Sequence, residues 1–361
     1  MKNSLGTSVI FTLFGESHQD YIGGVLDGLT PGIKVDENFI KEMLKKRRPS
    51  FKTDTSRIEN DDFEIISGVF NGYTDGSPLT ILIRNQNKQS GDYTPNIPRP
   101  SHADYVAHQR YHGFNDYRGG GHFSGRLTAP IVAIGSICLK ALEEKGIKIA
   151  THIKKCGDFK DDEIKNLEED INIINSKEMP IISNNENKLE EEILKAKNDA
   201  DSIGGITETF VSGLPLGVGE PWFSSLEGEI SRAMFALGGV KGIEFGEGFN
   251  FANGRGSSFN DEYYYDSNKI VKTRTNHNGG INGGISNGEP IVFSLAIKPT
   301  PSIGKEQNTI DLNKEENIVN AIKGRHDPAI IRRICVVITS LLAIVLADQL
   351  QLRFGVDYFR K

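Results

Sequence analysis

The sequence predicts an α+β fold built on antiparallel sheets. Segments typical of strands and of helices do not alternate regularly along the 361 residues, as they would in a doubly wound fold with a parallel sheet. Two segments, 127–142 and 334–352, are apolar almost all round, which is typical of helices buried on most sides. Two such helices indicate a core with further layers on both of its faces.

Strands are predicted where apolar and β-branched residues lie between turn signals. The first of them runs into the sequence Gly-Glu-Ser-His. The second and third are separated by Asn-Gly and Asp-Gly, which favours an antiparallel pair. In chain order the predicted strands span residues 8–14, 62–70, 79–84, 205–211 and 290–297.

Helices are predicted from their periodicity and their ends. Asp36 is a suitable N-cap for a first helix that continues to about Arg48 and ends at Pro49. The segment 101–125 is polar, aromatic and glycine-rich, so we expect a long ordered loop, and 246–287 is loop-rich. The remaining helices are predicted at residues 127–142, 189–200, 225–235 and 334–352.

Residues 1–361 are expected to form a single domain with a polar surface excursion at about residues 152–202. Lysine, glutamate, aspartate and asparagine are frequent in this stretch. Acids and bases alternate at helical spacing between 189 and 200, as in a solvated helix.

The composition excludes some partners. The net charge is −6, from 42 basic and 48 acidic residues, so a general attraction to nucleic acid or anionic lipid is not expected. Any anionic ligand must then be bound by a local cluster of cations. Three scattered cysteines favour a reducing compartment, and the first 18 residues lack the features of a signal peptide. The longest apolar run, 334–347, is shorter than the roughly 20 residues of a membrane span. We therefore expect a cytoplasmic protein with no membrane partner.

Glycine is over-represented. It accounts for 39 residues, about 11 % of the chain against about 7 % on average. Its pairs and triplets are spread over several segments, so they do not form one flexible linker. Because glycine lacks a Cβ atom, such segments suit loops that approach a ligand closely.

Ser17 and His18 end a motif that directly follows the first predicted strand. Neighbouring residues on an extended chain point to opposite faces, so these two are not expected to form a nucleophile–base pair. The functional interpretation is a histidine that donates to an anion, with the Ser17 hydroxyl as a further donor. The alternative is an ordinary turn.

Four basic residues, 45–48, end the first predicted helix. Cations at this end stabilise the helix dipole, which is one explanation of the cluster. Arg47 and Arg48 can equally form paired hydrogen bonds with phosphate or carboxylate oxygens. Both interpretations stay open on this motif alone.

The densest group of chemically active residues lies between His102 and Arg126. It holds four of the eight histidines, together with Ser124 and three consecutive glycines, 119–121. A metal site is one interpretation, but the spacing lacks the H-E-x-x-H pattern. Backbone donors of the glycines beside Ser124 and Arg126 suit an anionic or flavin-like ligand, and we favour this interpretation.

Further polar groups lie near the end of the chain. A second glycine-rich loop, 276–288, precedes a strand, and Lys298 follows that strand. Arg325 lies near the start of the last predicted helix, where anions bind readily. Asp327, directly before Pro328, is expected to be the N-cap of that helix.

Taken together, these segments resemble the chorismate synthase family over nearly the whole chain and in the same order. Each motif is weak alone, but the ordered set is very specific. The matching stretches are residues 14–18, 47–49, 99–105, 118–121 with Ser124 and Arg126, 201–205, 240–242, His277 with its paired glycines, 298–300 and 324–328.

The resemblance implies a sandwich with helices between antiparallel sheets, usually assembled as a homotetramer. It implies reduced flavin mononucleotide (FMN) as cofactor and 5-enolpyruvylshikimate 3-phosphate as substrate. The implied reaction belongs to the shikimate pathway of aromatic amino acid biosynthesis. It is a carbon–oxygen lyase reaction, a 1,4-elimination of phosphate that gives chorismate without net redox change.

The same resemblance assigns roles to residues of this chain. His102 would protonate or hydrogen-bond the reduced flavin, His18 would assist the departing phosphate, and Asp327 would help to remove the ring proton. The residues that would hold the substrate are Ser17, Arg47, Arg48, Arg126 and Arg325. Those that would contact the flavin are Ser124, Gly239, Gly283, Lys298, Pro299, Thr300, Pro301, Ser302 and Arg325.

The chain departs from the family pattern in places. After the glycine triplet the family commonly has Arg-Ser-Ser-Ala-Arg-Glu, whereas residues 122–127 read His-Phe-Ser-Gly-Arg-Leu. His122 is then a candidate substitute for the missing arginine. An arginine sometimes linked to NADP binding is Thr53 here, so an external flavin reductase becomes the alternative to intrinsic flavin reduction. Two rival functions are a metal-dependent phosphohydrolase and a protein that stores flavin without catalysis.

Overall fold

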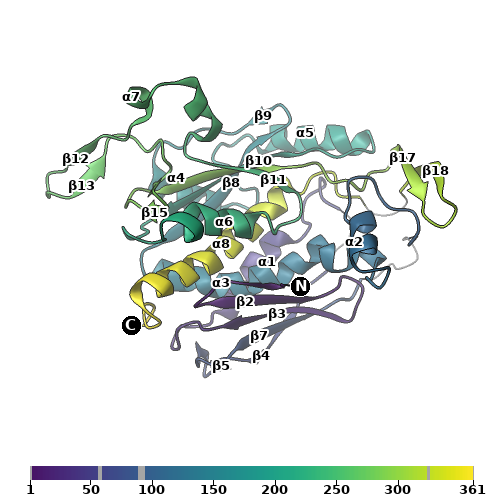
Figure 1. The fold of residues 1–361 in the computed structure, drawn as a ribbon, viewed down its shortest axis with the longest axis horizontal. Coiled ribbons are helices and arrows are strands. Elements are labelled where there is room, and N and C mark those ends of the chain that lie inside the picture. The colour runs from purple at the N-terminus through teal and green to yellow at the C-terminus, as the bar shows by residue number, and fades with distance from the viewer. Residues whose placement is uncertain (1, 56–58, 88–93, 323–325, 361) are drawn as a thin grey trace.

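Two five-stranded antiparallel sheets enclose a double layer of helices (Figure 1). The computed structural model describes residues 2–55, 59–87, 94–322 and 326–360. The first sheet packs on helix α3 (Thr128–Glu144) and the second on helix α8 (Ile331–Phe354), while the two helices pack on each other. This order of layers confirms the predicted α+β sandwich with helices between antiparallel sheets.

The N-terminal quarter of the chain forms the first sheet. The strands predicted at 62–70 and 79–84 are antiparallel neighbours in it, which confirms their pairing. A short hairpin, β5 (Val69–Phe70) and β6 (Tyr73–Thr74), connects them. In spatial order the sheet contains β1 (Ser4–Leu5), β2 (Ile10–Gly15), β3 (Tyr21–Asp27), β7 (Leu79–Arg84) and β4 (Phe63–Ser67).

The second sheet draws its strands from the middle and the C-terminal part of the chain. Its spatial order is β11 (Val240–Phe245), β16 (Ile291–Ile297), β10 (Gly205–Ser212), β8 (Lys148–Cys156) and β9 (Phe159–Lys160). Three further hairpins are β12 (Tyr263–Tyr265) with β13 (Val271–Thr273), β14 (Ile281–Asn282) with β15 (Ile285–Ser286), and β17 (Glu306–Asp311) with β18 (Glu316–Ala321). The β12–β13 and β17–β18 hairpins extend from opposite ends of the body (Figure 1).

Local sequence signals explain the first helix. Asp36 caps it as predicted, because its carboxylate accepts hydrogen bonds from the backbone N–H groups of Asn38 (3.0 Å) and Phe39 (3.1 Å). This first helix is α1 (Glu37–Arg47). The remaining helices are α2 (Asp104–Arg110), α4 (Leu167–Ser176), α5 (Glu186–Asn198), α6 (Leu226–Met234) and the single turn α7 (Gly256–Phe259).

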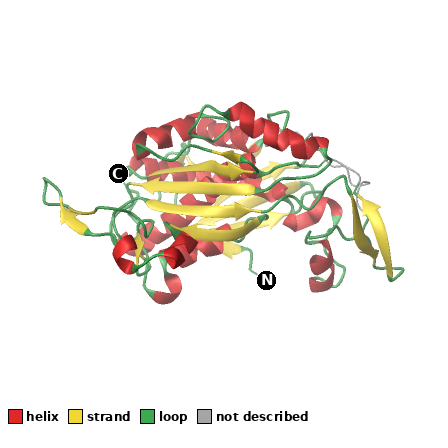
Figure 2. Cartoon of the chain, turned by 90° about the horizontal axis from the view of Figure 1, so that it is seen from above, coloured by secondary structure: helices red, strands yellow, loops and turns green. Residues whose placement is uncertain are grey.

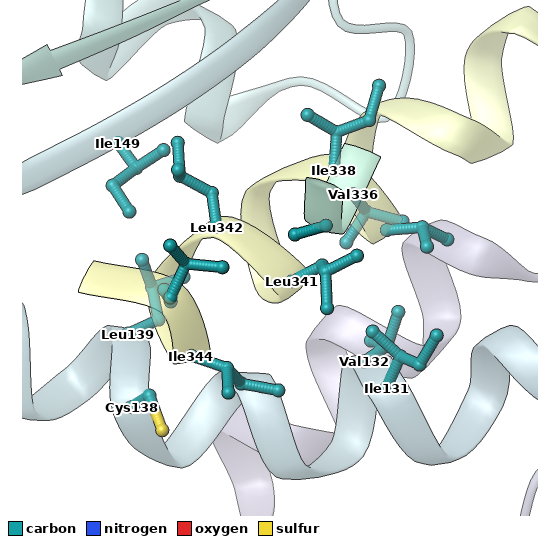
Figure 3. Close-up of a cluster of buried hydrophobic side chains, with 14 of the residues drawn as sticks. Ile131, Val132, Cys138, Leu139, Ile149, Val336, Ile338, Leu341, Leu342 and Ile344 are labelled. Atoms are coloured by element: carbon teal, nitrogen blue, oxygen red, sulfur yellow. The ribbon is translucent and has the colours of Figure 1, made fainter. Parts of the chain in front are cut away.

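The contact between α3 and α8 forms the centre of the hydrophobic core (Figure 3). Ile131 and Val132 of α3 face Leu341 of α8, and Leu342 points toward Ile149 of the second sheet. All five are buried.

A glycine explains how closely the two helices approach. A Cβ atom at Gly135 of α3 would lie 2.3 Å from the carbonyl oxygen of Ser340 in α8. Glycine in a helix interior usually destabilises it, by about 0.5–1 kcal/mol relative to alanine. Here the absence of a side chain permits the close packing.

Two segments, 118–144 and 331–354, are long and apolar enough to cross a membrane by length and composition alone. In their most apolar 18-residue windows, 83 % and 94 % of the residues are buried inside the fold. Both helices pack on each other and on one sheet each, an arrangement that accounts for their apolar surfaces without a membrane. Figure 2 shows the strands from above with helices around them.

Two expectations from the sequence need correction. The segment 101–125 is not one loop, because it contains α2 and the 3-10 segment Arg118–Phe123. The expected surface excursion at 152–202 begins too early, since residues 152–156 complete the inner strand β8. Only the later part, with α4 and α5, covers the face of the sheet that points away from α8.

Candidate active site

Three consecutive glycines, 119–121, form a turn that contacts both predicted catalytic histidines. Their φ angles are 60°, 83° and 53°, a left-handed region that glycine adopts without steric cost. A Cβ atom at Gly119 would lie 2.1 Å from Cε1 of His18, and one at Gly120 would lie 3.2 Å from Cε1 of His102. The structure therefore brings His18 and His102, 84 positions apart in sequence, onto neighbouring residues of one turn.

Ser17 and His18 contact each other, contrary to the expectation from an extended chain. The Ser17 Oγ atom lies 3.0 Å from Nδ1 of His18, because residues 16–19 form a turn closed by a hydrogen bond from the Gln19 N–H to the Glu16 carbonyl. The same hydroxyl lies within donating distance of the carbonyls of residues 118 (3.3 Å) and 119 (3.2 Å). With its proton directed to a carbonyl, the hydroxyl accepts from His18 Nδ1.

His102 belongs to a second polar group. Its Nδ1 lies 2.7 Å from Oδ1 of Asp104, and Arg99 donates to both oxygens of the same carboxylate, from Nε at 2.7 Å and from Nη2 at 2.8 Å. Burial alone would raise the pKa of Asp104, but hydrogen bonds from Arg99 and His102 hold the pKa below its usual range. The carboxylate therefore stays ionised beside the imidazole.

Two of the predicted substrate arginines lie in one buried cluster. Arg47 donates to Oδ2 of Asp61 from Nε (3.2 Å) and Nη2 (2.7 Å), and Arg126 forms a short contact with Oδ1 of the same carboxylate. Glu59 lies 3.4 Å from Arg126 Nη2. The Asp61 side chain is 0 % exposed, and the two formal positive charges of this group are matched by two negative ones.

The electrostatics of this cluster follow from burial. Burial favours the neutral form of Asp61, but the neighbouring Arg47 and Arg126 charges outweigh it and lower the Asp61 pKa. Burial also lowers the pKa of Arg126, although Asp61 opposes the shift. Arg48, in contrast, points to the edge of the cluster and donates to the Asn60 carbonyl at 2.9 Å.

Asn85 connects the arginine cluster to the turn at residues 16–19, which holds Ser17 and His18. Its side-chain oxygen accepts from Nε of Arg126 at 2.9 Å. Its side-chain nitrogen donates to the carbonyls of Glu16 (3.0 Å) and Gln19 (2.9 Å), which flank the Ser17–His18 pair. The structure thus places the cations and the histidines side by side.

Asp327 is not the N-cap of the last helix, so that prediction is wrong. Helix α8 begins only at Ile331, and the Asp327 carboxylate instead forms an ion pair with Arg333 in its first turn. Burial lowers the pKa of Arg333 to about 10, and the charges of Asp54, Arg47 and Asp61 act on it as well. The Asp327 Oδ1 atom has no hydrogen-bond partner among the described residues.

Five of the predicted flavin residues lie in one segment, 298–302, which contacts the backbone of Asp327. The backbone N–H of Lys298 donates to the Gly239 carbonyl (2.9 Å), and its Nζ donates to the Ser101 carbonyl (2.8 Å). Thr300 donates to the Asp327 carbonyl at 2.5 Å. The segment 298–302, which includes Pro299, Pro301 and Ser302, therefore lies between the His102 loop and Asp327.

Other predicted residues lie elsewhere. Gly283 lies in the β14–β15 turn, beside the first turn of α6, whereas Gly239 follows the other end of that helix. At 1.5 Å per residue, the two ends of α6 are roughly 14 Å apart. The Ser124 hydroxyl accepts from the N–H of Arg126 at 3.3 Å and caps a short 3-10 turn. Arg325 lies outside the described residues.

A hollow of about 710 Å³ adjoins the start of the 16–19 turn. It is lined in part by Glu16, Tyr111, His112, His122 and Phe123. His122, the candidate substitute for the missing arginine, lies 2.8 Å through Nδ1 from the Gly15 carbonyl. Within the described residues no group of three or more His, Cys, Asp or Glu side chains could hold a metal ion.

Sequence reasoning missed the acids of the site. Asp61 and Glu59 lie in an ordinary polar stretch, and no local pattern links them to Arg126, which follows Asp61 by 65 positions and Glu59 by 67. The partner role of Arg333 was missed because Asp327 precedes a proline in a sequence typical of a helix cap. Asp104 lies within the densest motif, but its contact with His102 depends on the turn of the chain at the start of α2, which the sequence did not predict.

Two histidines on a glycine turn, next to buried arginines in an α+β sandwich, define an enzyme site for a polyanionic ligand. The pattern of a family described as "Chorismate synthase" matches residues 9–351. The chain belongs to the chorismate synthase family, and it is a lyase of the shikimate pathway.

Individual relatives agree over their full lengths. The chain is 43 % identical to "Chorismate synthase" of Pyrococcus abyssi, covering 96 % of this chain and 97 % of that one. It is 42 % identical to "Chorismate synthase" of Lachnoclostridium phytofermentans, covering 99 % and 98 %. A solved structure, "Crystal Structure of Chorismate Synthase", superimposes with a TM-score of 0.76 at 28 % identity, covering 97 % and 94 % of the two chains.

Proposed function

We propose that this chain eliminates phosphate from 5-enolpyruvylshikimate 3-phosphate with the help of reduced FMN and so forms chorismate. The observation that supports this most strongly is the contact of His18 and His102 with consecutive glycines, linked through Asn85 to the buried arginines. A proton-handling pair beside a cation cluster suits a reaction in which a proton and a phosphate leave the same ring.

Arg47 and Arg126 would bind anionic groups of the substrate, which carries a phosphate and two carboxylates. Guanidinium groups bind such oxygens with paired hydrogen bonds. In the free protein these donors are engaged by Asp61, so a substrate anion at Arg126 would compete with Asp61 for the same N–H groups. Ser17, Arg48 and Arg325 are proposed as further substrate contacts.

The residues fit a bound flavin in two respects. A Cβ atom at Gly283 would meet no atom within 4 Å, so its surroundings leave room for a ligand, and its φ of 61° is one that glycine adopts readily. Lys298, whose pKa is lowered by partial burial and by Lys241, supplies a cation for an anionic group of the cofactor. When bound, the reduced flavin supplies the electron-rich group that assists phosphate departure. Ser124, Gly239 and 299–302 would complete this site.

The protons would be handled by three residues. His18 would act on the departing phosphate, with Nδ1 held by the Ser17 hydroxyl. His102 would exchange a proton at the turn through its Nε2, which lies 3.5 Å from the position of a Cβ atom at Gly120. Asp327 would help to remove the ring proton, and its Oδ1, which has no hydrogen-bond partner among the described residues, is available to accept it.

We further propose a cytoplasmic homotetramer that receives reduced flavin from an external reductase. Several large apolar side chains are solvent-exposed in a single chain, including Trp222 (85 %), Phe223 (100 %) and Phe249 (84 %). Exposed aromatic residues of this kind are typical of subunit contacts. The arginine that would favour intrinsic reduction is replaced by Thr53.

Anaerobic turnover with chemically reduced FMN tests the main proposal. We expect chorismate and phosphate in equal amounts, and no product without reduced flavin. Phosphate release without chorismate, abolished by a chelator, would instead indicate a metal-dependent phosphohydrolase. Tight flavin binding with no reaction on the substrate would indicate flavin storage.

The flavin site has its own test. In Gly283→Val, a bulky side chain would fill the open space and would also strain a turn with φ 61°. FMN binding measured by fluorescence quenching should be lost, and the circular dichroism spectrum checks that the fold survives. Normal FMN affinity of folded Gly283→Val would remove Gly283 from the site.

A further inference from the structure

We propose that Asp104 is a positioning residue that keeps His102 protonated on Nδ1 and leaves Nε2 directed at the glycine turn. The inference rests on the proposed function, because it gives His102 a proton to handle. Which ring nitrogen is active depends on the hydrogen bond that the other nitrogen makes. The partner of Nδ1 therefore decides what Nε2 can do.

The geometry assigns that partner. The Asp104 Oδ1 atom lies 2.7 Å from Nδ1 of His102, and the carboxylate is ionised because of its bonds to Arg99 and His102. An ionised carboxylate accepts hydrogen bonds and donates none, so Nδ1 must carry the proton. In a neutral imidazole, Nε2 is then an acceptor that can take up a proton from the turn side.

A second contact would require the opposite tautomer. Nη2 of Arg99 lies 3.1 Å from Nδ1 of His102 and is always a donor. This contact is longer than the carboxylate contact, and the same Nη2 already donates to Asp104 Oδ1 at 2.8 Å. The shorter contact with an ionised acceptor is the stronger one, so Asp104 sets the tautomer and Arg99 fixes Asp104.

The two oxygens of Asp104 have different tasks. Oδ2 accepts from the backbone N–H (3.0 Å) and Nε (2.7 Å) of Arg99 and so closes the loop before α2. Oδ1 contacts Nδ1 of His102 and also accepts from Nη2 of Arg99 at 2.8 Å. In Asp104→Asn the amide oxygen can keep the Oδ2 contacts, which places the amide N–H group against Nδ1 of His102. The substitution therefore keeps the two contacts that close the loop, loses the bond from Nη2 of Arg99 to Oδ1, and inverts the tautomer.

A purely structural role is the competing explanation. Asp104 is the first residue of α2, where an acid also stabilises the helix dipole. Loss of that effect would change stability without changing which nitrogen of His102 is protonated. The ring nitrogen is therefore the measurement that separates the two explanations.

The chain provides a matched control. Asp116 repeats the pattern with Arg118, accepting from its backbone N–H (3.1 Å), Nε (2.8 Å) and Nη2 (2.8 Å). Its remaining side-chain contact is the amide of Gln19 at 3.3 Å, not an imidazole. Asp116→Asn thus makes the same chemical change in a neighbouring loop.

The test is nuclear magnetic resonance of ¹⁵N-histidine-labelled protein at alkaline pH, with His102 assigned by His102→Gln. We expect the Nδ1–H tautomer in the wild type and in Asp116→Asn, and the Nε2–H tautomer in Asp104→Asn. The Nδ1–H form persisting in folded Asp104→Asn would overturn the proposal. Because Asp104→Asn could unfold, Arg99→Gln gives a second measurement: the Nδ1–H form should persist there, and its loss would assign tautomer control to Arg99.

Turnover supplies the link to function. We expect Asp104→Asn to lower kcat by about a hundredfold or more, as for loss of general acid–base catalysis or a wrong tautomer, with the substrate KM little changed. An inverted tautomer with normal kcat would overturn the positioning role in catalysis. Failure of the wild type to make chorismate would refute the proposed function, while the tautomer result would still stand on its own.

Discussion

Replacing Asp61 by asparagine removes the negative charge that Arg47 and Arg126 share. The Asp61 side chain is fully buried, and its two oxygens contact one arginine each. An asparagine of the same shape keeps one acceptor oxygen but turns the other position into a donor that faces a guanidinium group. Of the two original carboxylates only Glu59 remains, at 3.4 Å from Arg126.

The expected cost follows from burial. Removing one partner of a buried ion pair typically destabilises a protein by about 3–5 kcal/mol, because an uncompensated charge is left behind. We expect this loss in the free energy of unfolding at neutral pH. Since the folded-state pKa of Asp61 lies below its usual value of 3.8, the carboxylate contributes stability above that pH and loses it as the pH falls further. The difference between variant and wild type should therefore be constant at neutral pH and shrink in acid.

Urea unfolding followed by circular dichroism measures this difference. Circular dichroism is the better probe because the single tryptophan, Trp222, is 85 % exposed. The matched control is Asp62→Asn, an identical change at the next residue, whose side chain is exposed. An Asp61→Asn protein as stable as Asp62→Asn would refute the reasoning. If Arg47 and Arg126 bind substrate anions, the substrate should also stabilise Asp61→Asn more than the wild type.

The remaining predictions concern the glycine turn and the ion pair at α8. Gly119→Ala should lower kcat and displace the His18 ring, since the new Cβ would lie 2.1 Å from it. The control is Gly125→Ala, whose Cβ would meet no atom within 4 Å and which should leave stability and kcat nearly unchanged. Equal kcat values for the two variants would contradict the contact between Gly119 and His18. Asp327→Asn should slow chorismate formation at least about tenfold, a barrier rise near 1.4 kcal/mol. It should also lower the melting temperature, because Arg333 loses its carboxylate partner. Normal turnover would make Asp327 a structural partner of Arg333 alone.

The elements with strong local signals were predictable from the sequence. Asp36 provides the first helix with a side-chain cap, and the structure uses it. The apolar surfaces of α3 and α8 required burial on most sides, and both helices lie between the sheets. In these cases the information lies within a few turns of one helix, so a single sequence contains it.

The errors share a different cause. The N-cap assignment failed because Asp327 is held by Arg333 rather than by the start of the helix. The Ser17–His18 contact depends on a turn that a strand-like sequence does not reveal. The end of strand β8, residues 152–156, was assigned to a polar excursion because the residues that follow it are rich in charged side chains. These three features are an ion pair, a tight turn and a strand with charged neighbours, and hydrophobic periodicity reports none of them.

The arginine cluster shows the same limit for function. A sequence with several arginines in matched motifs predicts anion binding, but it does not reveal that buried carboxylates engage those arginines in the free protein. The affinity for a ligand anion is then the difference between two ion-pair networks, one with Asp61 and one with the ligand. Removing an arginine weakens both networks, so its effect on affinity does not measure one contact. Asp61→Asn changes only the free-protein network, which makes it the more informative substitution for the role of Arg126.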